Sequence, residues 1–136
     1  MVKTLDEYIQ MYEKHTGEKF EFNSSFSFFY EPEHGFCEYR MEDTGLYIWQ
    51  LCGDLKYWVD IGYKFCKMHE LPAMSAYILR KPKPFIRALG FKIESMENED
   101  GYKRYHCRNE AGEILIATQY GEKYIFVWKI GGESNV

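Results

Sequence analysis

The sequence lacks any apolar run that approaches the roughly 18 residues needed to span a bilayer. Its opening stretch, residues 1–17, also lacks the apolar segment of a secretory signal peptide. Cysteine is sparse, and no CxxC pair occurs among Cys37, Cys52, Cys66 and Cys107. Without a secretory start or paired cysteines, disulfides are not expected. We therefore expect a soluble, cytoplasmic protein with reduced, mostly buried thiols and no membrane segment.

An excess of basic charge is absent as well. The formal net charge is −4, which argues against general binding of nucleic acids. The charge is uneven: residues 1–55 carry 4 basic and 11 acidic side chains, residues 56–92 carry 8 and 2, and residues 93–136 carry 5 and 8. A basic middle between acidic flanks is compatible with a solvated helix face. It also suits an anionic small ligand lying over the middle of the fold.

The chain does contain enough apolar material for one core. It has 136 residues, of which 46% are hydrophobic and 18% aromatic, and it shows no repeat or linker that would divide it. We expect a single domain over residues 1–136. Helical spacing and end signals predict helices over 4–15, over 55–69 and from Pro82 to a stop at Gly90.

Runs rich in aromatic and β-branched residues predict the strands, with Gly- and Pro-containing turns between them. These strands cover residues 26–32, 36–42, 46–52, 71–81, 91–96, 102–108, 113–119 and 123–130. The run at 46–51 is apolar on both faces, which is typical of a central strand. A strand–helix–strand crossover makes the two strands around helix 55–69 parallel. The prediction is an α/β fold with a mixed, mostly antiparallel sheet and antiparallel C-terminal strands.

Two short motifs carry a resemblance to a known family. Gln50-Leu51-Cys52-Gly53 joins a strand to a helix, and Leu89-Gly90-Phe91 ends the short helix. In this order the segments resemble the GNAT superfamily of acetyl-CoA-dependent N-acetyltransferases, over roughly residues 26–108. The whole sequence is also similar to small GNAT-like proteins encoded by bacteriophages. The resemblance implies acyl transfer from acetyl-CoA to a small-molecule or peptide amine.

The resemblance also implies which residues bind the cofactor. The strand end would pair with the pantetheine arm, and the loop amides and helix N-terminus would hold the pyrophosphate, as backbone N–H groups and the helix dipole attract anions. A basic cluster after the next strand would meet the adenosine phosphate. The residues in these positions are Gln50, Leu51, Cys52, Gly53, Asp54, Leu55, Lys56, Arg80 and Lys81. Gly53 and Asp54 are equally explained by an ordinary strand-to-helix turn with an N-cap.

The sequence departs from the family where catalysis is concerned. The family's general acid is commonly a tyrosine before the Leu-Gly-Phe ending, and Ile86 or Arg87 stands there. Tyr77 is the nearest replacement by sequence, near the end of the strand that follows helix 55–69. Glu38, in the strand next to the central one, is our candidate for the base that takes the amine proton. An acidic solvated face is the simpler interpretation of Glu38 and its neighbours.

Other functions remain open at the sequence level. A family member that has lost its chemistry would act as a binding or structural module through protein–protein contacts. His34 with Cys37, and Cys66 with His69, have a spacing that could supply zinc ligands. Cys37 or Cys107, each near a histidine, could act as a thiol nucleophile. Buried thiols and ordinary helix spacing explain these pairs better, so no metal site is expected.

Overall fold

The computed structural model describes residues 2–78, 82–121 and 123–130. This part of the chain forms three helices and eight strands, in the order that the sequence predicts. The elements are α1 Leu5–Thr16, β1 Ser27–Glu31, β2 Gly35–Glu42, β3 Gly45–Gly53, α2 Leu55–Met68, β4 Ala73–Ile78, α3 Pro82–Ala88, β5 Lys92–Glu99, β6 Tyr102–Arg108, β7 Ile114–Tyr120 and β8 Lys123–Lys129.

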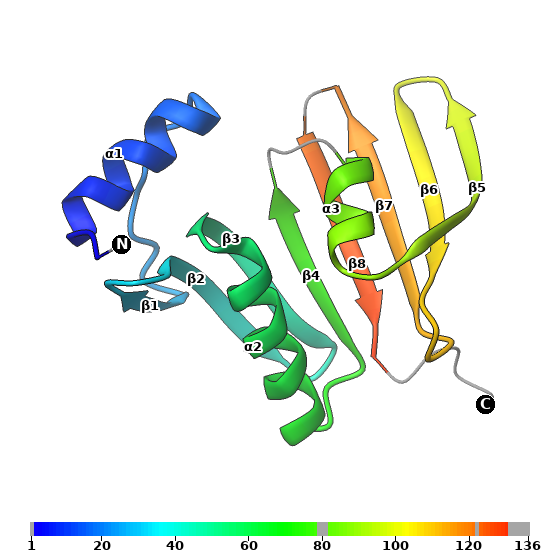
Figure 1. Cartoon of the computed structure of the whole chain (residues 1–136), viewed down its shortest axis with the longest axis horizontal. Coiled ribbons are helices and arrows are strands. Elements are labelled where there is room, and N and C mark those ends of the chain that lie inside the picture. Colours follow the sequence, from blue (N-terminus) through cyan, green and yellow to red (C-terminus); the bar gives the residue numbers. More distant parts are fainter. Residues whose placement is uncertain (1, 79–81, 122, 131–136) are drawn as a thin grey trace.

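All eight strands belong to one sheet, in the order β1-β2-β3-β4-β8-β7-β6-β5 (Figure 1). Within the described chain β3 and β4 pair in parallel, and the other neighbours pair antiparallel. The parallel pair flanks α2, as a crossover requires. The α/β class and the mixed, mostly antiparallel sheet are thereby confirmed.

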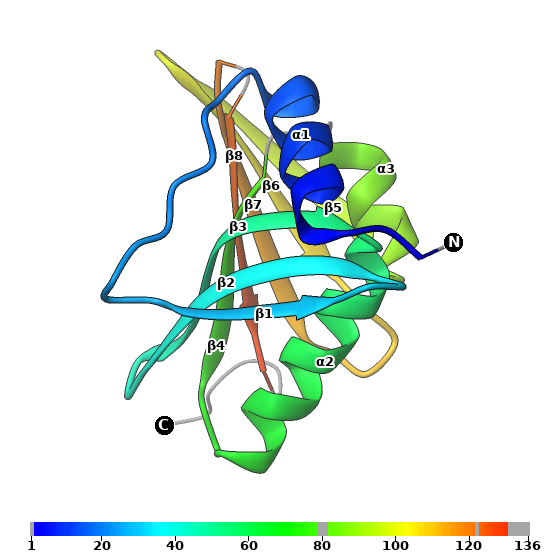
Figure 2. The same cartoon turned by 90° about the vertical axis from the view of Figure 1, so that its left-hand side faces the viewer.

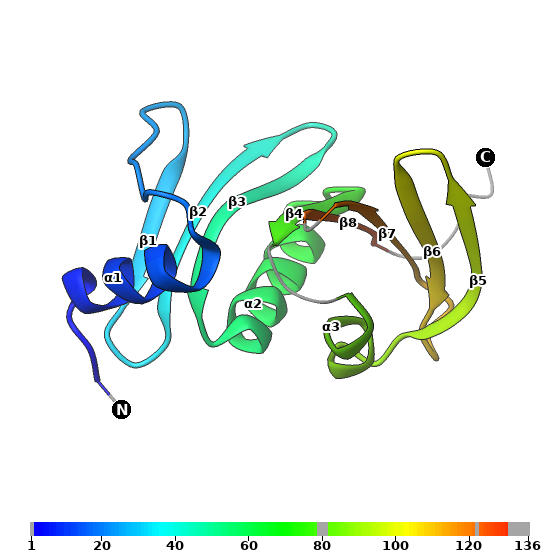
Figure 3. The same cartoon turned by 90° about the horizontal axis from the view of Figure 1, so that it is seen from above.

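Helices cover both faces of the sheet. At its β1–β3 end, α1 lies above the strands and α2 lies below them (Figure 2). The sheet curves around α2 and α3, which share one side (Figure 3). Between the sheet and these two helices lies the larger apolar core, which includes Ile48, Val59 and Phe126. A second, aromatic core under α1 includes Tyr12, Phe36 and Cys52.

An extra residue in β3 changes the direction of its side chains. Glu38 pairs with Gln50 whereas Tyr39 pairs with Ile48, so Trp49 has no partner in β2 and forms a β-bulge. Before the bulge, Ile48 packs in the core beside α2. After it, Cys52 packs in the core beneath α1. The bulge therefore places Trp49 and Gln50 on the same face.

Local signals set the helix ends. Thr4 caps α1 through a reciprocal pair of hydrogen bonds with Glu7, and Gly17 ends it in the left-handed conformation. Asp54 caps α2 by accepting from the Tyr57 amide at 3.2 Å. In the part of the chain that the structure describes, no helix combines the length and apolarity needed to cross a membrane.

Candidate functional site

The candidate site lies where the two parallel strands separate. Strands β3 and β4 pair at three positions only, from Leu46–Met74 to Ile48–Ala76. Beyond them β3 follows β2 as far as Gly53, and β4 follows β8 as far as Ile78. The strands consequently diverge toward their C-terminal ends (Figure 1). The sequence predicted this parallel pair, and the structure confirms it.

The divergence leaves backbone groups of β3 facing an opening. The amide of Asp54 donates to the His34 carbonyl of the β2 side at 2.8 Å. Because backbone groups alternate in direction along a strand, those of Cys52 also point toward β2. The amide and carbonyl groups of Leu51 and Gly53 then point toward the opening. They are available to an extended, amide-containing ligand.

A cleft of about 480 Å³ occupies this opening on the α1 side, and we call it the strand-opening cleft. Its walls are the end of β3, the end of β4 and the last two turns of α1. It is lined by Met11, Tyr12, His15, Thr16, Leu51, Cys52, Gly53, Tyr77 and Ile78. Three of the predicted cofactor residues, Leu51, Cys52 and Gly53, therefore line one cleft together with Tyr77.

A second cleft, of about 350 Å³, adjoins the first, and we call it the polar cleft. The segment that follows α1 closes one side of it, and β2, β3 and β4 supply the rest. It is lined by Tyr12, Glu18, Lys19, Glu21, Phe22, Asn23, Ser24, Glu38, Trp49, Gln50 and Tyr77. Tyr12 and Tyr77 line both clefts, so a molecule in one cleft can lie against a molecule in the other.

Glu38 is the deepest charged group of the polar cleft. Its side chain is 1% exposed. One carboxylate oxygen accepts from Nε2 of Gln50 at 2.9 Å, and the other accepts from the amide of Asn23 at 3.1 Å. Gln50 also donates to the carbonyl of Glu21 at 2.7 Å. Gln50 therefore anchors the segment after α1 and orients Glu38, although the sequence predicted a cofactor contact for it.

Tyr77 stands at the junction of the clefts. Its ring stacks on Trp49 with centroids 5.0 Å apart and planes 18° apart, and its hydroxyl lies 3.5 Å from Oε1 of Glu18. Burial, reinforced by Glu18, raises the pKa of Tyr12 to about 12. The Tyr12 hydroxyl therefore stays protonated near neutral pH and can act there as a hydrogen-bond donor.

Sequence reasoning missed several residues of this site. Tyr12 lies within the helix predicted over residues 4–15, and Trp49 lies within the apolar run predicted as a central strand; neither was assigned to a site. Glu18 and Glu21 lie in a segment to which the sequence assigned no role. Nothing local distinguishes these side chains, because only the bulge and the path of the chain after α1 bring them together.

The predicted phosphate cradle at the start of α2 has a different local structure. Gly53 has φ +99°, and a Cβ there would overlap the His34 carbonyl oxygen and lie 2.9 Å from Cα of Gly35. The close pairing of β2 with β3 thus accounts for this glycine. Asp54 is the helix N-cap, and its carboxylate lies 3.5 Å from Nδ1 of His34. The His34 ring stacks on Tyr57 with centroids 3.5 Å apart.

The remaining predicted cofactor and catalytic residues lie in α2, in α3 and outside the described residues. Leu55 and Lys56 form the first turn of α2, and no acceptor in the described chain pairs with their amides. Arg80 and Lys81 lie outside the described residues. Ile86, in the position of the family's tyrosine, is fully buried. It packs in the core beneath α3, which suits an aliphatic side chain.

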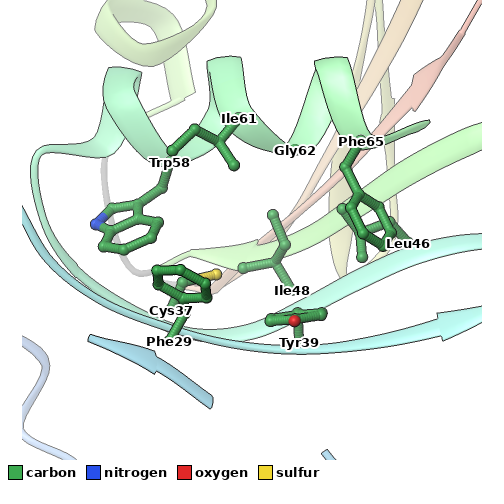
Figure 4. A pocket seen from close by; sticks show the side chains of 9 residues that line it. All are labelled: Phe29, Cys37, Tyr39, Leu46, Ile48, Trp58, Ile61, Gly62 and Phe65. Atoms are coloured by element: carbon green, nitrogen blue, oxygen red, sulfur yellow. The ribbon is translucent and has the colours of Figure 1, made fainter. Parts of the chain in front are cut away.

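A third, apolar pocket of about 170 Å³ lies between α2 and the β1–β3 end of the sheet. Figure 4 shows side chains of α2 pointing down toward side chains of the strands. Its lining is almost wholly apolar and includes Phe29, Ile61 and Phe65. Cys37 also lines it, and burial raises the pKa of this thiol to about 12. The pocket therefore offers an apolar surface and no reactive group.

The alternative metal and thiol sites gain no support from the geometry. Among the described residues no group of three or more His, Cys, Asp or Glu side chains could hold a metal ion. All four cysteines are buried and none forms a disulfide, as the sequence predicted. Burial raises the pKa of Cys66 and of Cys107 to about 11, which disfavours a thiolate nucleophile.

Comparison of the chain with protein-family models, with curated proteins and with solved structures gives no match.

Proposed function

We propose that this protein binds an acyl-CoA in the strand-opening cleft and transfers the acyl group to an amine held in the polar cleft. The observation that carries the proposal is the divergence of β3 and β4, with two adjoining clefts that share Tyr12 and Tyr77. Two reactants, one in each cleft, would meet at this junction. Positioning of that kind is a large part of catalysis for a reaction between two substrates.

The residues present fit the pantetheine arm better than the pyrophosphate. The arm is a neutral, extended chain with amide groups, and it matches the outward-facing backbone of Leu51 and Gly53. At the N-terminus of α2, the amides of Leu55 and Lys56 have no acceptor among the described residues, and the Asp54 carboxylate competes with an anion. The arm would accordingly contribute more to binding than the phosphates do.

The chain's own groups can serve the proton transfers. As the amine nitrogen bonds to the acyl carbon and the carbon–sulfur bond breaks, the nitrogen loses a proton and the thiolate gains one. Glu38 would accept the amine proton, directly or through water, because it lines the polar cleft. The Tyr77 hydroxyl would supply a proton to the sulfur. General acid–base help of this kind is typically worth about 10²–10⁴-fold in rate.

Calorimetric titration with acetyl-CoA and with CoA tests the cofactor part. We expect a Kd in about the micromolar range. His15→Trp would fill the strand-opening cleft from α1 and should weaken binding by at least about tenfold. Lys14→Trp is the matched control, because the exposed Lys14 is next to His15 in α1 and does not line the cleft. Undetectable heat at millimolar CoA would exclude the proposal.

Release of free thiol from acetyl-CoA, followed against a panel of amines, tests the transfer. We expect slow turnover, below about 10 per second, that increases with pH as the acceptor amine loses its proton. Glu38→Gln should reduce the rate and leave acetyl-CoA affinity unchanged. Fast turnover that is insensitive to this substitution would show that another group is the base.

A second candidate is a catalytically inactive module that acts through protein–protein contacts. The apolar pocket beside α2 favours it, because Phe29 and Ile61 at that pocket are exposed and exposed apolar groups often mark interfaces. Tight acetyl-CoA binding without thiol release for any acceptor would favour this alternative.

A further inference from the structure

The polar cleft carries an excess of negative charge that no ion pair among the described residues compensates. Three carboxylates (Glu18, Glu21 and Glu38) and one ammonium group (Lys19) line it. The formal charge of the lining is therefore −2. A neutral ligand would leave this charge unbalanced, whereas a ligand with two positive charges would balance it.

Glu38 contributes a buried negative charge to the polar cleft. It is buried, and the two donors that reach it, an amide side chain and a backbone amide, are neutral. The ion pairs of the described residues all lie elsewhere. A buried carboxylate without a cation is costly. A cation bound in the cleft would remove much of that cost.

The aromatic wall of the cleft is suited to the rest of such a ligand. Trp49 is 48% exposed although it stacks on Tyr77, so its outer ring face is accessible. Ring faces attract ammonium groups, and they also cover the methylene segments between two charges. The cleft thus combines carboxylates for the charged ends with apolar rings for an aliphatic chain.

We infer that the polar cleft binds an aliphatic amine with at least two positive charges, of the diamine or polyamine class. The role of this molecule as acyl acceptor rests on the proposed function; its binding does not. One amino group would lie toward Tyr77 and Glu38, where it loses its proton before it bonds to the acyl carbon. The distal ammonium group would lie between Glu18 and Glu21.

Calorimetry with 1,4-diaminobutane, spermidine and n-butylamine tests the inference. The two multivalent amines should bind at least about tenfold more tightly than n-butylamine, because each further charge-assisted contact adds affinity. Their affinity should decrease as salt increases. Equal binding of the monoamine and the diamine, or no binding of either, would overturn the inference.

Substitutions locate the binding in this cleft. The double variant Glu18→Gln with Glu21→Gln changes side chains that are not deeply buried, and it should weaken 1,4-diaminobutane about tenfold. Glu110→Gln is the control, because it changes the same charge at an exposed position of the β6–β7 turn. A loss of equal size in the control would overturn the assignment. Glu38→Gln is not used to locate the binding, because Glu38 is also the proposed base.

The two proposals fail in different ways. If 1,4-diaminobutane binds and acetyl-CoA does not, the inference stands and the acyl-transfer function is excluded. If acetyl-CoA binds and no multivalent amine does, the cleft is not a site for this class of amine and acyl transfer stands with another acceptor. Measuring both ligands on one protein preparation distinguishes these results.

Discussion

Replacement of Gly53 by alanine tests whether this glycine serves the fold. Its φ of +99° is unfavourable for any residue with a Cβ, and its new methyl group would overlap the His34 carbonyl oxygen. Gly90 is the matched comparison: it follows α3, its φ is +85°, and nothing lies within 4 Å of the Cβ that alanine would add. Both alanines experience backbone strain, and only the one at position 53 also meets another strand.

The expected decrease in Tm follows from the cost of the backbone strain and the cost of the steric overlap. The left-handed conformation costs an L-residue about 1–2 kcal/mol, and forcing a methyl group into a packed site costs about 1–3 kcal/mol more. For 136 residues, 1 kcal/mol corresponds to about 3.5 °C in Tm. Gly53→Ala should then lower Tm by about 7–17 °C, and Gly90→Ala by about 3–7 °C.

Thermal unfolding followed by circular dichroism, with urea unfolding as a check, measures both variants. Equal decreases in Tm would refute the argument, because the close approach of β2 would then have no energetic consequence. A stable Gly53→Ala variant that no longer binds acetyl-CoA would instead assign the glycine to the ligand. We expect Gly53→Ala to destabilise the fold whether or not acetyl-CoA is present. Acetyl-CoA binding by this variant is therefore measured at a temperature where the variant is fully folded.

Three further outcomes can be measured. Tyr77→Phe keeps the ring on Trp49 and removes the hydroxyl, so thiol release should decrease by about tenfold or more with acetyl-CoA affinity unchanged; an unchanged rate would exclude Tyr77 as the acid. Burial raises the pKa of Cys37 to about 12 and of Cys107 to about 11. The two thiols therefore stay protonated to a higher pH in the folded state than in the unfolded state. The free energy of unfolding should decrease as pH rises above about 9. A free energy of unfolding in urea that does not change between about pH 9 and 11 would contradict this. Thr4→Ala removes the cap of α1 and should cost about 1 kcal/mol, which differential scanning calorimetry would detect.

The fold was largely predictable because each element has a strong local signal. Helical spacing over 55–69 matches α2 at Leu55–Met68 to within one residue. The strand–helix–strand order fixes the parallel pairing, since an intervening helix leaves no other short connection. The short helix predicted from its prolines to Gly90 is α3, which ends at Ala88. A GNAT-like fold in the narrower sense stays a proposal.

The site was less predictable, because its residues come together through contacts distant in sequence. Glu38 was placed beside the central strand correctly, since consecutive strands joined by a short turn pair with each other. Its neighbours Glu18 and Trp49 had no distinguishing pattern. Gly53 had two explanations that the sequence could not separate, and only the position of His34, in the turn just before β2, shows why a glycine is needed for the fold.

The bulge at Trp49 connects these observations. Strict alternation along β3 would place Trp49 and Gln50 on opposite faces, and Gln50 could not then hold Glu38 in the cleft that Trp49 lines. One extra residue puts both side chains on the same face and occurs just after the last pairing with β4. The bulge that lies where β3 and β4 separate therefore also assembles the polar cleft beside the opening. A change that restored regular pairing of β3 with β2, such as deletion of Trp49, would be expected to remove both.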